Sequence, residues 1–257
     1  MDGMEPTLEI TGRVATITLR RPDSANRLGD TDLDMLSRHI AQVNDCGAAV
    51  LRIRASGRYF CAGYDLRAMH DSQGAGADTF GQAMDALEAA RPVTIALVDG
   101  GAYGGGTDLC LACDFRLGTP ASHMQMTALK FGIHLYQGGL ERYVSRLGLD
   151  AAKRLLLTAE KIEAPAMLSL GFLSEIVAQD ALQARADELS AVLAGMSPEA
   201  LFSTKKHLNA IARGGLDPDM LHADIQRVHA SADTRRRLLG WQERRGAVLR
   251  GAQGAGR

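Results

Sequence analysis

The stretch "GGAYGGGTDLCLACD", Gly100–Asp114, has almost no side-chain bulk in its first half and one carboxylate in the middle. Five of its first seven residues are glycine and a sixth is alanine. The preceding segment, "PVTIALVDG" at 92–100, is almost continuously apolar, which predicts a strand buried on both faces. The residues after the glycines are apolar apart from Asp108, which predicts a buried helix. The stretch therefore predicts a turn from a strand into a helix with an unobstructed backbone.

Several kinds of site use such a turn. A dinucleotide-binding turn needs the spacing G-x-G-x-x-G, which this stretch lacks. A phosphate-binding loop, G-x-x-x-x-G-K-[ST], fits Gly101 and Gly106 but has Thr107 in place of its lysine. An oxyanion hole needs only backbone N–H groups at a helix start, with no Cβ to block a carbonyl oxygen. Tight packing of the helix on the sheet is the alternative that involves no ligand.

A second stretch has the same organisation. In "GRYFCAGYDLRAM", Gly57–Met69, a predicted strand ends and "AGYD" turns into a helix. Two such turns, from neighbouring parallel strands, could each supply one N–H group to a single oxygen atom. The pair of turns favours an oxyanion hole over simple packing.

Strands and helices alternate along the first half of the chain, which predicts an α/β fold with parallel strands and crossover helices. Strands are expected at 13–19, 48–56, 92–100 and 114–118, and a mobile loop at 71–78. From Gly139 onward the sequence is mostly helical. Apolar side chains recur there at helical spacing in three stripes: Leu182, Ala186, Leu189 and Leu193; Leu201, Leu208 and Ile211; and Leu221, Ile225 and Val228.

Composition limits the classes of function. The chain has 257 residues, a formal net charge of −1 and 46% hydrophobic residues, as expected of a soluble globular protein. No overall positive charge would attract nucleic acid, and no apolar run of about 18 residues would span a membrane. The amino terminus lacks the apolar run of a secretory signal. We therefore expect a cytoplasmic protein with neither a nucleic-acid nor a membrane partner.

The cysteines give no sign of a metal site. Four cysteines are too few for a disulfide framework in a chain of this length. Cys110 and Cys113 form a C-x-x-C pair, which could bind zinc or carry out redox chemistry. No second pair stands at metal spacing and the neighbours are apolar, so we expect buried thiols and no metal.

The two glycine stretches, "YFCAGYDLRAM" and "VDGGAYGGGTDLCLACD", resemble the two signatures of the crotonase, or enoyl-CoA hydratase/isomerase, superfamily. Three other segments resemble the family in the same order: "GRVATITLRRPDSANRL" at 12–28, "LLLTAEKIEAPAMLSLGFLSEIV" at 155–177 and "LFSTKKHLNA" at 201–210. The resemblance implies the crotonase (ClpP/crotonase-like) α/β fold, with repeated ββα units and a C-terminal helical trimerisation region. It implies a core at 1–195 with an acyl-CoA site. A helical subdomain at 196–257 would serve oligomerisation and cover the CoA, in a homotrimer or hexamer.

The resemblance also implies an acyl-CoA thioester as substrate, with coenzyme A as part of it and no other cofactor. The backbone N–H groups of Tyr64 and Gly105 would polarise the thioester carbonyl and hold an enolate. Asp65 could instead cap the next helix. The substrate-binding residues implied by the motif match are Ala62, Tyr64, Asp65, Leu66, Arg67, Gly104, Gly105, Ala128 and Lys205.

The family's hydratases use two glutamates, because one carboxyl group can accept a proton while the other donates one. The first falls on Asp108, an acid shorter by one methylene group. The second falls on Ala128, which cannot transfer a proton. The sequence therefore departs from the two-glutamate pattern.

Three hypotheses follow for the function. The first is a divergent hydratase or isomerase that uses Asp108. The second is a decarboxylase, C–C hydrolase or other lyase that uses Tyr136 or His134, from the loop after Gly132. The third is a non-catalytic acyl-CoA-binding homologue. A pocket wall is the alternative role for Tyr136, and a surface or subunit contact for His134.

Overall fold

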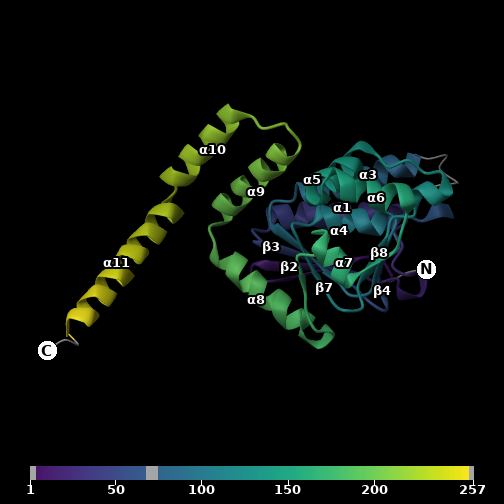
Figure 1. Ribbon diagram of the computed structural model, residues 1–257. Coiled ribbons are helices and arrows are strands. Elements are labelled where there is room, and N and C mark those ends of the chain that lie inside the picture. Colours follow the sequence, from purple (N-terminus) through teal and green to yellow (C-terminus); the bar gives the residue numbers. More distant parts are fainter. Residues whose placement is uncertain (1–3, 68–74, 255–257) are drawn as a thin grey trace. The chain divides into compact units, whose positions relative to one another are not determined.

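The structure, a computed structural model, describes residues 4–67 and 75–254 (Figure 1). The chain divides into two compact units, Met1–Gly195 and Met196–Arg257. The first contains every strand of the described chain, and the second is helical.

A six-stranded sheet forms the base of the first unit, in the order β1-β2-β3-β5-β7-β10. Its strands are β1 (Thr7–Thr11), β2 (Val14–Leu19), β3 (Val50–Ala55), β5 (Val93–Val98), β7 (Phe115–Gly118) and β10 (Glu175–Ile176). Only β1 and β2 pair antiparallel, and the remaining neighbours are parallel. Every residue of β5 is buried, because this central strand is covered on both faces, as its continuous apolar run predicts.

A second, four-stranded sheet has the order β4-β6-β8-β9. Its strands are β4 (Tyr59–Cys61), β6 (Gly101–Tyr103), β8 (His123–Gln125) and β9 (Ile162–Glu163). Strands β4, β6 and β8 are parallel, and β9 pairs antiparallel with β8. A long strand of the first sheet precedes each parallel strand of the second, and α4 (Gly105–Ala112) follows β6. This is the repeated ββα arrangement expected from the sequence.

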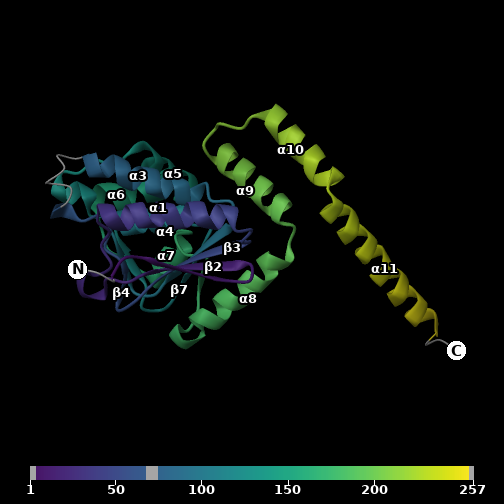
Figure 2. The ribbon, with the colours of Figure 1, turned by 180° about the vertical axis from the view of Figure 1, so that it is seen from behind.

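Helices cover both faces of the larger sheet. Helices α1 (Asp30–Asp45), α3 (Ala75–Glu88) and α5 (Gln137–Leu147) lie on one side of the strands, and α8 (Leu182–Gly195) lies on the other (Figure 2). Side chains of β3 alternate between these sides. Ile53 belongs to the core cluster beneath α1, while the Arg52 guanidinium donates through Nε to Ser190 Oγ of α8 at 2.8 Å. The described part of this unit also contains α6 (Leu149–Thr158) and α7 (Ala164–Ser169).

The second unit consists of α9 (Pro198–Ala212), α10 (Pro218–Ala230) and α11 (Ala232–Gly254). An ion-pair cluster joins α9 to α10, where Asp224 accepts hydrogen bonds from Lys206 at 2.5 Å and pairs with His207 at 2.9 Å. The predicted apolar stripe of α9 does not face inward, because Leu208 and Ile211 are more than half exposed. No helix in residues 4–67 and 75–254 is long and apolar enough to cross a membrane.

The longer strands agree with the sequence-based prediction, but the short strands β6, β8, β9 and β10 were not predicted, and the segments at β1 and at 71–78 also differ. The strands expected at 13–19, 48–56, 92–100 and 114–118 are β2, β3, β5 and β7. The edge strand β1 has no sequence prediction, because most of its residues are exposed and give little burial signal. The loop expected at 71–78 is wrong from Ala75 onward, where α3 begins, and 71–74 lie outside the described residues.

Candidate active site

Two glycine turns form one edge of the site. Strands β4 and β6 are parallel neighbours, with Tyr59 opposite Gly101, so their carboxyl ends lie at the same edge of the sheet. The chain leaves β4 through Gly63, whose φ of +84° favours glycine. It leaves β6 through Gly104, with φ +50°, directly before α4.

The two turns touch through their backbones. A Cβ placed on Gly63 would lie 2.5 Å from the Gly105 nitrogen and 2.9 Å from the Tyr103 carbonyl oxygen. Only a residue without a side chain therefore fits at this point. Because Gly105 is the first residue of α4, its amide has no carbonyl within the helix to bond. The backbone amides of Tyr64 and Gly105 thus belong to adjoining turns.

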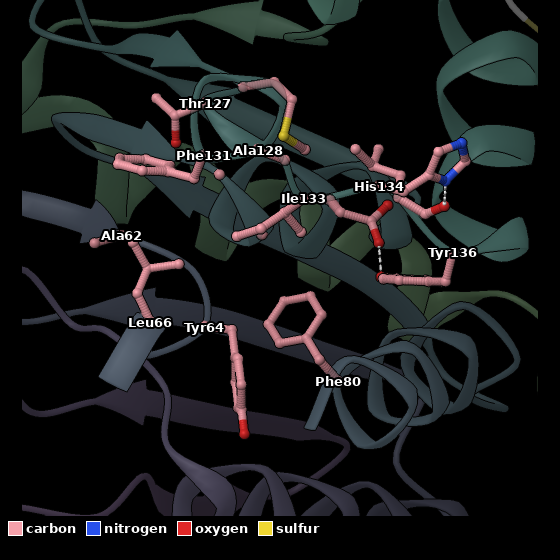
Figure 3. A pocket seen from close by; sticks show the side chains of 15 residues that line it. Ala62, Tyr64, Leu66, Phe80, Thr127, Ala128, Phe131, Ile133, His134 and Tyr136 are labelled. Carbon is pink, nitrogen blue, oxygen red and sulfur yellow. Dashed lines mark hydrogen bonds between the residues drawn. The ribbon is translucent and has the colours of Figure 1, made fainter. Parts of the chain in front are cut away.

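These turns open onto a cavity of about 110 Å³, shown from close by in Figure 3. Its lining is mostly apolar and draws on the two turns, α3, α4 and the segment from β8 to α5. The lining residues are Ala62, Tyr64, Leu66, Phe80, Gly104, Gly105, Asp108, Met126, Thr127, Ala128, Phe131, Ile133, His134, Leu135 and Tyr136.

Phe80 of α3 lies between the two tyrosines of the pocket (Figure 3). Its ring centroid is 6.1 Å from that of Tyr64 and 6.3 Å from that of Tyr136. The ring also packs against the start of α4, where a Cβ on Gly105 would lie 2.6 Å from Phe80 Cζ. The Tyr64 hydroxyl points away from the pocket and donates to Asp30 Oδ1 at 2.5 Å. Phe80 therefore forms an apolar wall beside the glycine turns.

Asp108 is the acidic side chain of this pocket. It lies on α4 and is 2% exposed. It accepts hydrogen bonds from Arg142 of α5 and from Tyr136, the residue directly before α5. The Arg142 guanidinium donates to both carboxylate oxygens, from Nε to Oδ1 at 2.8 Å and from Nη2 to Oδ2 at 2.9 Å. The Tyr136 hydroxyl donates to Oδ2. Asp108 is therefore a buried, paired carboxylate with one face toward the cavity.

The Tyr136 hydroxyl is a neutral polar group in this setting. Burial and the nearby Asp108 charge raise the pKa of Tyr136 well above its usual range. The ring packs against α3, where a Cβ on Gly81 would lie 3.0 Å from it. Tyr136 can therefore donate or accept hydrogen bonds but holds its proton firmly.

A buried thiol supports the first glycine turn. The Gly63 amide donates to Cys61 Sγ at 3.3 Å, and the thiol donates to the Asn26 carbonyl oxygen at 3.2 Å. Burial raises the pKa of Cys61 to about 12. Cys110 and Cys113 are likewise buried free thiols, as expected from the sequence.

Most of the predicted site residues line this one cavity, and three do not. Asp65 Oδ1 accepts from the Arg67 amide at 3.0 Å, which is the helix-capping alternative, and Asp65 also pairs with Arg27 at 3.0 Å. Arg67 is exposed. Lys205 lies in the second unit, where it is 8% exposed on α9. The cavity belongs to the first unit, so the contact of Lys205 with CoA stays a prediction.

The sequence analysis missed the fully buried Arg142, which contacts Asp108. It also missed six residues that line the cavity: Phe80, Met126, Thr127, Phe131, Ile133 and Leu135. A signal for Arg142 exists in "QGGLERY", because Gly138 and Arg142 stand four residues apart on one face of α5. An arginine in that position on the buried face of a helix requires a carboxylate partner.

Comparisons with known proteins show which proteins the chain is similar to. The family model described as enoyl-CoA hydratase/isomerase matches residues 9–251. A short-chain-enoyl-CoA hydratase of Clostridium acetobutylicum is 29% identical over 79% of this chain and 80% of its own. The 2,3-dehydroadipyl-CoA hydratase of Escherichia coli is 31% identical over 76% of this chain and 78% of its own. The crystal structure of an enoyl-CoA hydratase from Bacillus anthracis is 25% identical, with a TM-score of 0.85 over 93% of this chain and 96% of that one.

Proposed function

The chain belongs to the enoyl-CoA hydratase/isomerase family, of crotonase fold, and on this basis we propose that it is an enzyme acting on an acyl-CoA thioester. The backbone N–H groups of Tyr64 and Gly105 donate to the thioester oxygen. They stabilise the negative charge that develops there as an enolate forms. The acyl group occupies the cavity, and the segment from Tyr64 to Arg67 lines the groove for the CoA chain.

The observation that carries this proposal is the contact between the two glycine turns. A Cβ on Gly63 would overlap the Gly105 nitrogen, and Tyr64 and Gly105 line the same cavity. Backbone donors of this kind are fixed before the substrate arrives, so they need no reorganisation as charge develops. Loss of one such donor typically costs about 3 kcal/mol of transition-state stabilisation.

The reaction we favour is of the hydratase or isomerase type, in a divergent form. By the motif match, Asp108 corresponds to the first carboxylate and Ala128 to the second, so the usual pair of carboxylates would be incomplete. Both residues line the cavity, which supports this assignment. A single acid group beside the enolate could transfer one proton, with water or a substrate group taking the place of its partner.

The pairing of Asp108 supports a second candidate, a lyase that decarboxylates or hydrolyses a C–C bond. Arg142 and Tyr136 both donate hydrogen bonds to the Asp108 carboxylate. The Tyr136 hydroxyl then serves as the polar group toward the acyl site. His134 also lines the cavity, with Nδ1 2.6 Å from the Leu135 carbonyl oxygen. A third candidate is an acyl-CoA-binding homologue without catalysis.

The assembly and setting belong to the same proposal. We expect a homotrimer or hexamer in the cytoplasm, without metal or redox cofactor and without a nucleic-acid or membrane partner. Apolar side chains exposed on the second unit support the oligomer, because exposed apolar groups gain free energy when a second subunit covers them. They include Leu208, Ile211, Leu238, Leu239 and Trp241.

Incubation with three thioesters tests the proposal. Crotonyl-CoA loses its 2-enoyl absorbance in a hydratase, a 3-enoyl-CoA gains it in an isomerase, and malonyl-CoA releases CO₂ in a decarboxylase. Acetoacetyl-CoA provides a readout without turnover, because its enolate absorbs in the near ultraviolet and an oxyanion hole would enrich it. Micromolar binding without turnover of any ester would favour the binding-only candidate. Absence of any CoA-ester binding would refute the proposal.

A further inference from the structure

Arg142 has an unusual position for a cation. Its side chain is fully buried, yet it lies beside three carboxylates. Besides its two bonds to Asp108, Nη1 donates to Asp85 at 2.7 Å and to Glu88 at 3.1 Å. Removing a guanidinium from water costs several kcal/mol, and only complete pairing offsets this cost. The arrangement therefore fixes Arg142 firmly in one orientation.

The fixed orientation of Arg142 determines which hydrogen-bond acceptor positions of the Asp108 carboxylate are occupied. An ionised carboxylate has about four acceptor positions. Two are taken by Arg142, whose planar fork matches both oxygens at once, and a third is taken by the Tyr136 hydroxyl. One acceptor position of the Asp108 carboxylate is therefore left.

The same cluster orients the Tyr136 hydroxyl. Its proton is directed at Asp108 Oδ2, and its oxygen accepts a hydrogen bond from Arg142 Nη2 at 3.3 Å. A phenolic oxygen in this state has one acceptor position left. Tyr136 lines the cavity, so this position is the one available to a ligand. It suits a hydroxyl group or a water, which can donate, and does not suit a carboxylate, which cannot.

We propose that Arg142 is a positioning residue: by clamping Asp108 it directs the Tyr136 proton inward, so that the Tyr136 oxygen accepts a hydrogen bond from a hydroxyl group on the acyl chain or from a water in its place. This inference rests on the proposed function, because it assumes that an acyl-CoA occupies the cavity. It adds the chemical preference of the site, a hydroxyacyl thioester over its unsubstituted analogue.

Binding affinities test the proposal without turnover. Calorimetry compares 3-hydroxybutyryl-CoA, as the racemate, with butyryl-CoA, which differs only in the hydroxyl group. A net hydrogen bond is worth about 0.5–1.5 kcal/mol, so the wild type should bind the hydroxy ester roughly 2- to 13-fold more tightly. Tyr136→Phe should abolish this preference, so that the two esters bind this variant with equal affinity. Arg142→Lys keeps the charge but not the bidentate fork, so it should also abolish the preference.

Arg146→Met is the matched control. Arg146 lies on the same helix and pairs with Glu88 at 3.2 Å, while Arg142 holds Asp108, so the preference should survive in this variant. If Arg142→Lys does not fold, Asp108→Asn takes its place, because it removes the carboxylate through which Arg142 acts, and the preference should again be lost. Wild-type preference retained in Tyr136→Phe, in Arg142→Lys or in a folded Asp108→Asn overturns the inference.

The two proposals fail in different ways. Equal affinity of the wild type for both esters overturns the inference alone, because the CoA site would still be present. Binding of neither ester by the wild type overturns the proposed function and the inference with it.

Discussion

Replacement of Gly63 by alanine should separate the two turns on which the proposed chemistry depends. The new Cβ would lie 2.5 Å from the Gly105 nitrogen and 2.9 Å from the Tyr103 oxygen. Comfortable contacts are about 3.5–4.0 Å, so the turns would have to move apart by about 1 Å. Both obstructing atoms are backbone, which cannot rotate away as a side chain could.

The expected effect has two components. Alanine at a φ of +84° costs roughly 1–2 kcal/mol of stability, and the overlap adds to this. A displacement of about 1 Å at a catalytic group can cost about 100-fold in rate. Loss of one oxyanion donor costs about 100- to 1,000-fold in kcat. We therefore expect Gly63→Ala to lower kcat by about two to three orders of magnitude and to weaken the acetoacetyl-CoA enolate band.

Gly47→Ala is the control for backbone strain. Gly47 has a similar φ of +76°, and a Cβ there would have nothing within 4 Å. Both variants should lose stability, by thermal unfolding, and only Gly63→Ala should lose the enolate band and activity. If a folded Gly63→Ala matches Gly47→Ala in enolate absorbance and in kcat, the two turns do not form an oxyanion hole.

Three further predictions concern other parts of the chain. A thiol reagent at pH 8 should modify only the exposed Cys46 in the native protein and all four cysteines after unfolding. The other three thiols are buried, and burial raises the pKa of Cys61 to about 12, so fast modification of a second thiol in the native protein would contradict this. Hydrogen bonds from Lys206 and His207 lower the pKa of Asp224 to about 2. The stability this gives is complete above the unfolded pKa of about 4 and is lost as the pH falls through the folded pKa of about 2, so Asp224→Asn should lower Tm clearly at pH 7 and much less at pH 2. Ala128→Glu should raise crotonyl-CoA hydration by about 100-fold if this residue marks the missing carboxylate, and an unchanged rate would count against that alignment.

The parts of the site that depend on the backbone could be predicted from the sequence. Gly63 and Gly105 act through the absence of a side chain at a turn, and such turns are visible as glycine between an apolar strand and a helix. The burial of Val93–Val98 could also be predicted, because its continuous apolar run is a local pattern in the sequence. Local patterns therefore indicated the two glycine turns, and the family resemblance assigned Tyr64 and Gly105 to the proposed oxyanion hole.

The parts that depend on packing between distant helices could not be predicted. Arg142 meets Asp85 across 57 residues of sequence and Asp108 across 34. No local pattern states that these helices will place their charges together. The apolar stripe of α9 is exposed, although its periodicity predicts a buried face. Apolar periodicity does not say whether the same chain or another subunit covers that face. The contact of Lys205 with CoA stays a prediction, because Lys205 belongs to the second unit and the cavity to the first.

A crystal structure of the protein with acetoacetyl-CoA tests the central claim most directly. The account predicts that the thioester oxygen lies about 2.7–3.1 Å from the backbone nitrogens of both Tyr64 and Gly105, with the acyl group against Phe80. A bound thioester whose oxygen contacts neither amide, or whose acyl group lies outside the cavity, would contradict it.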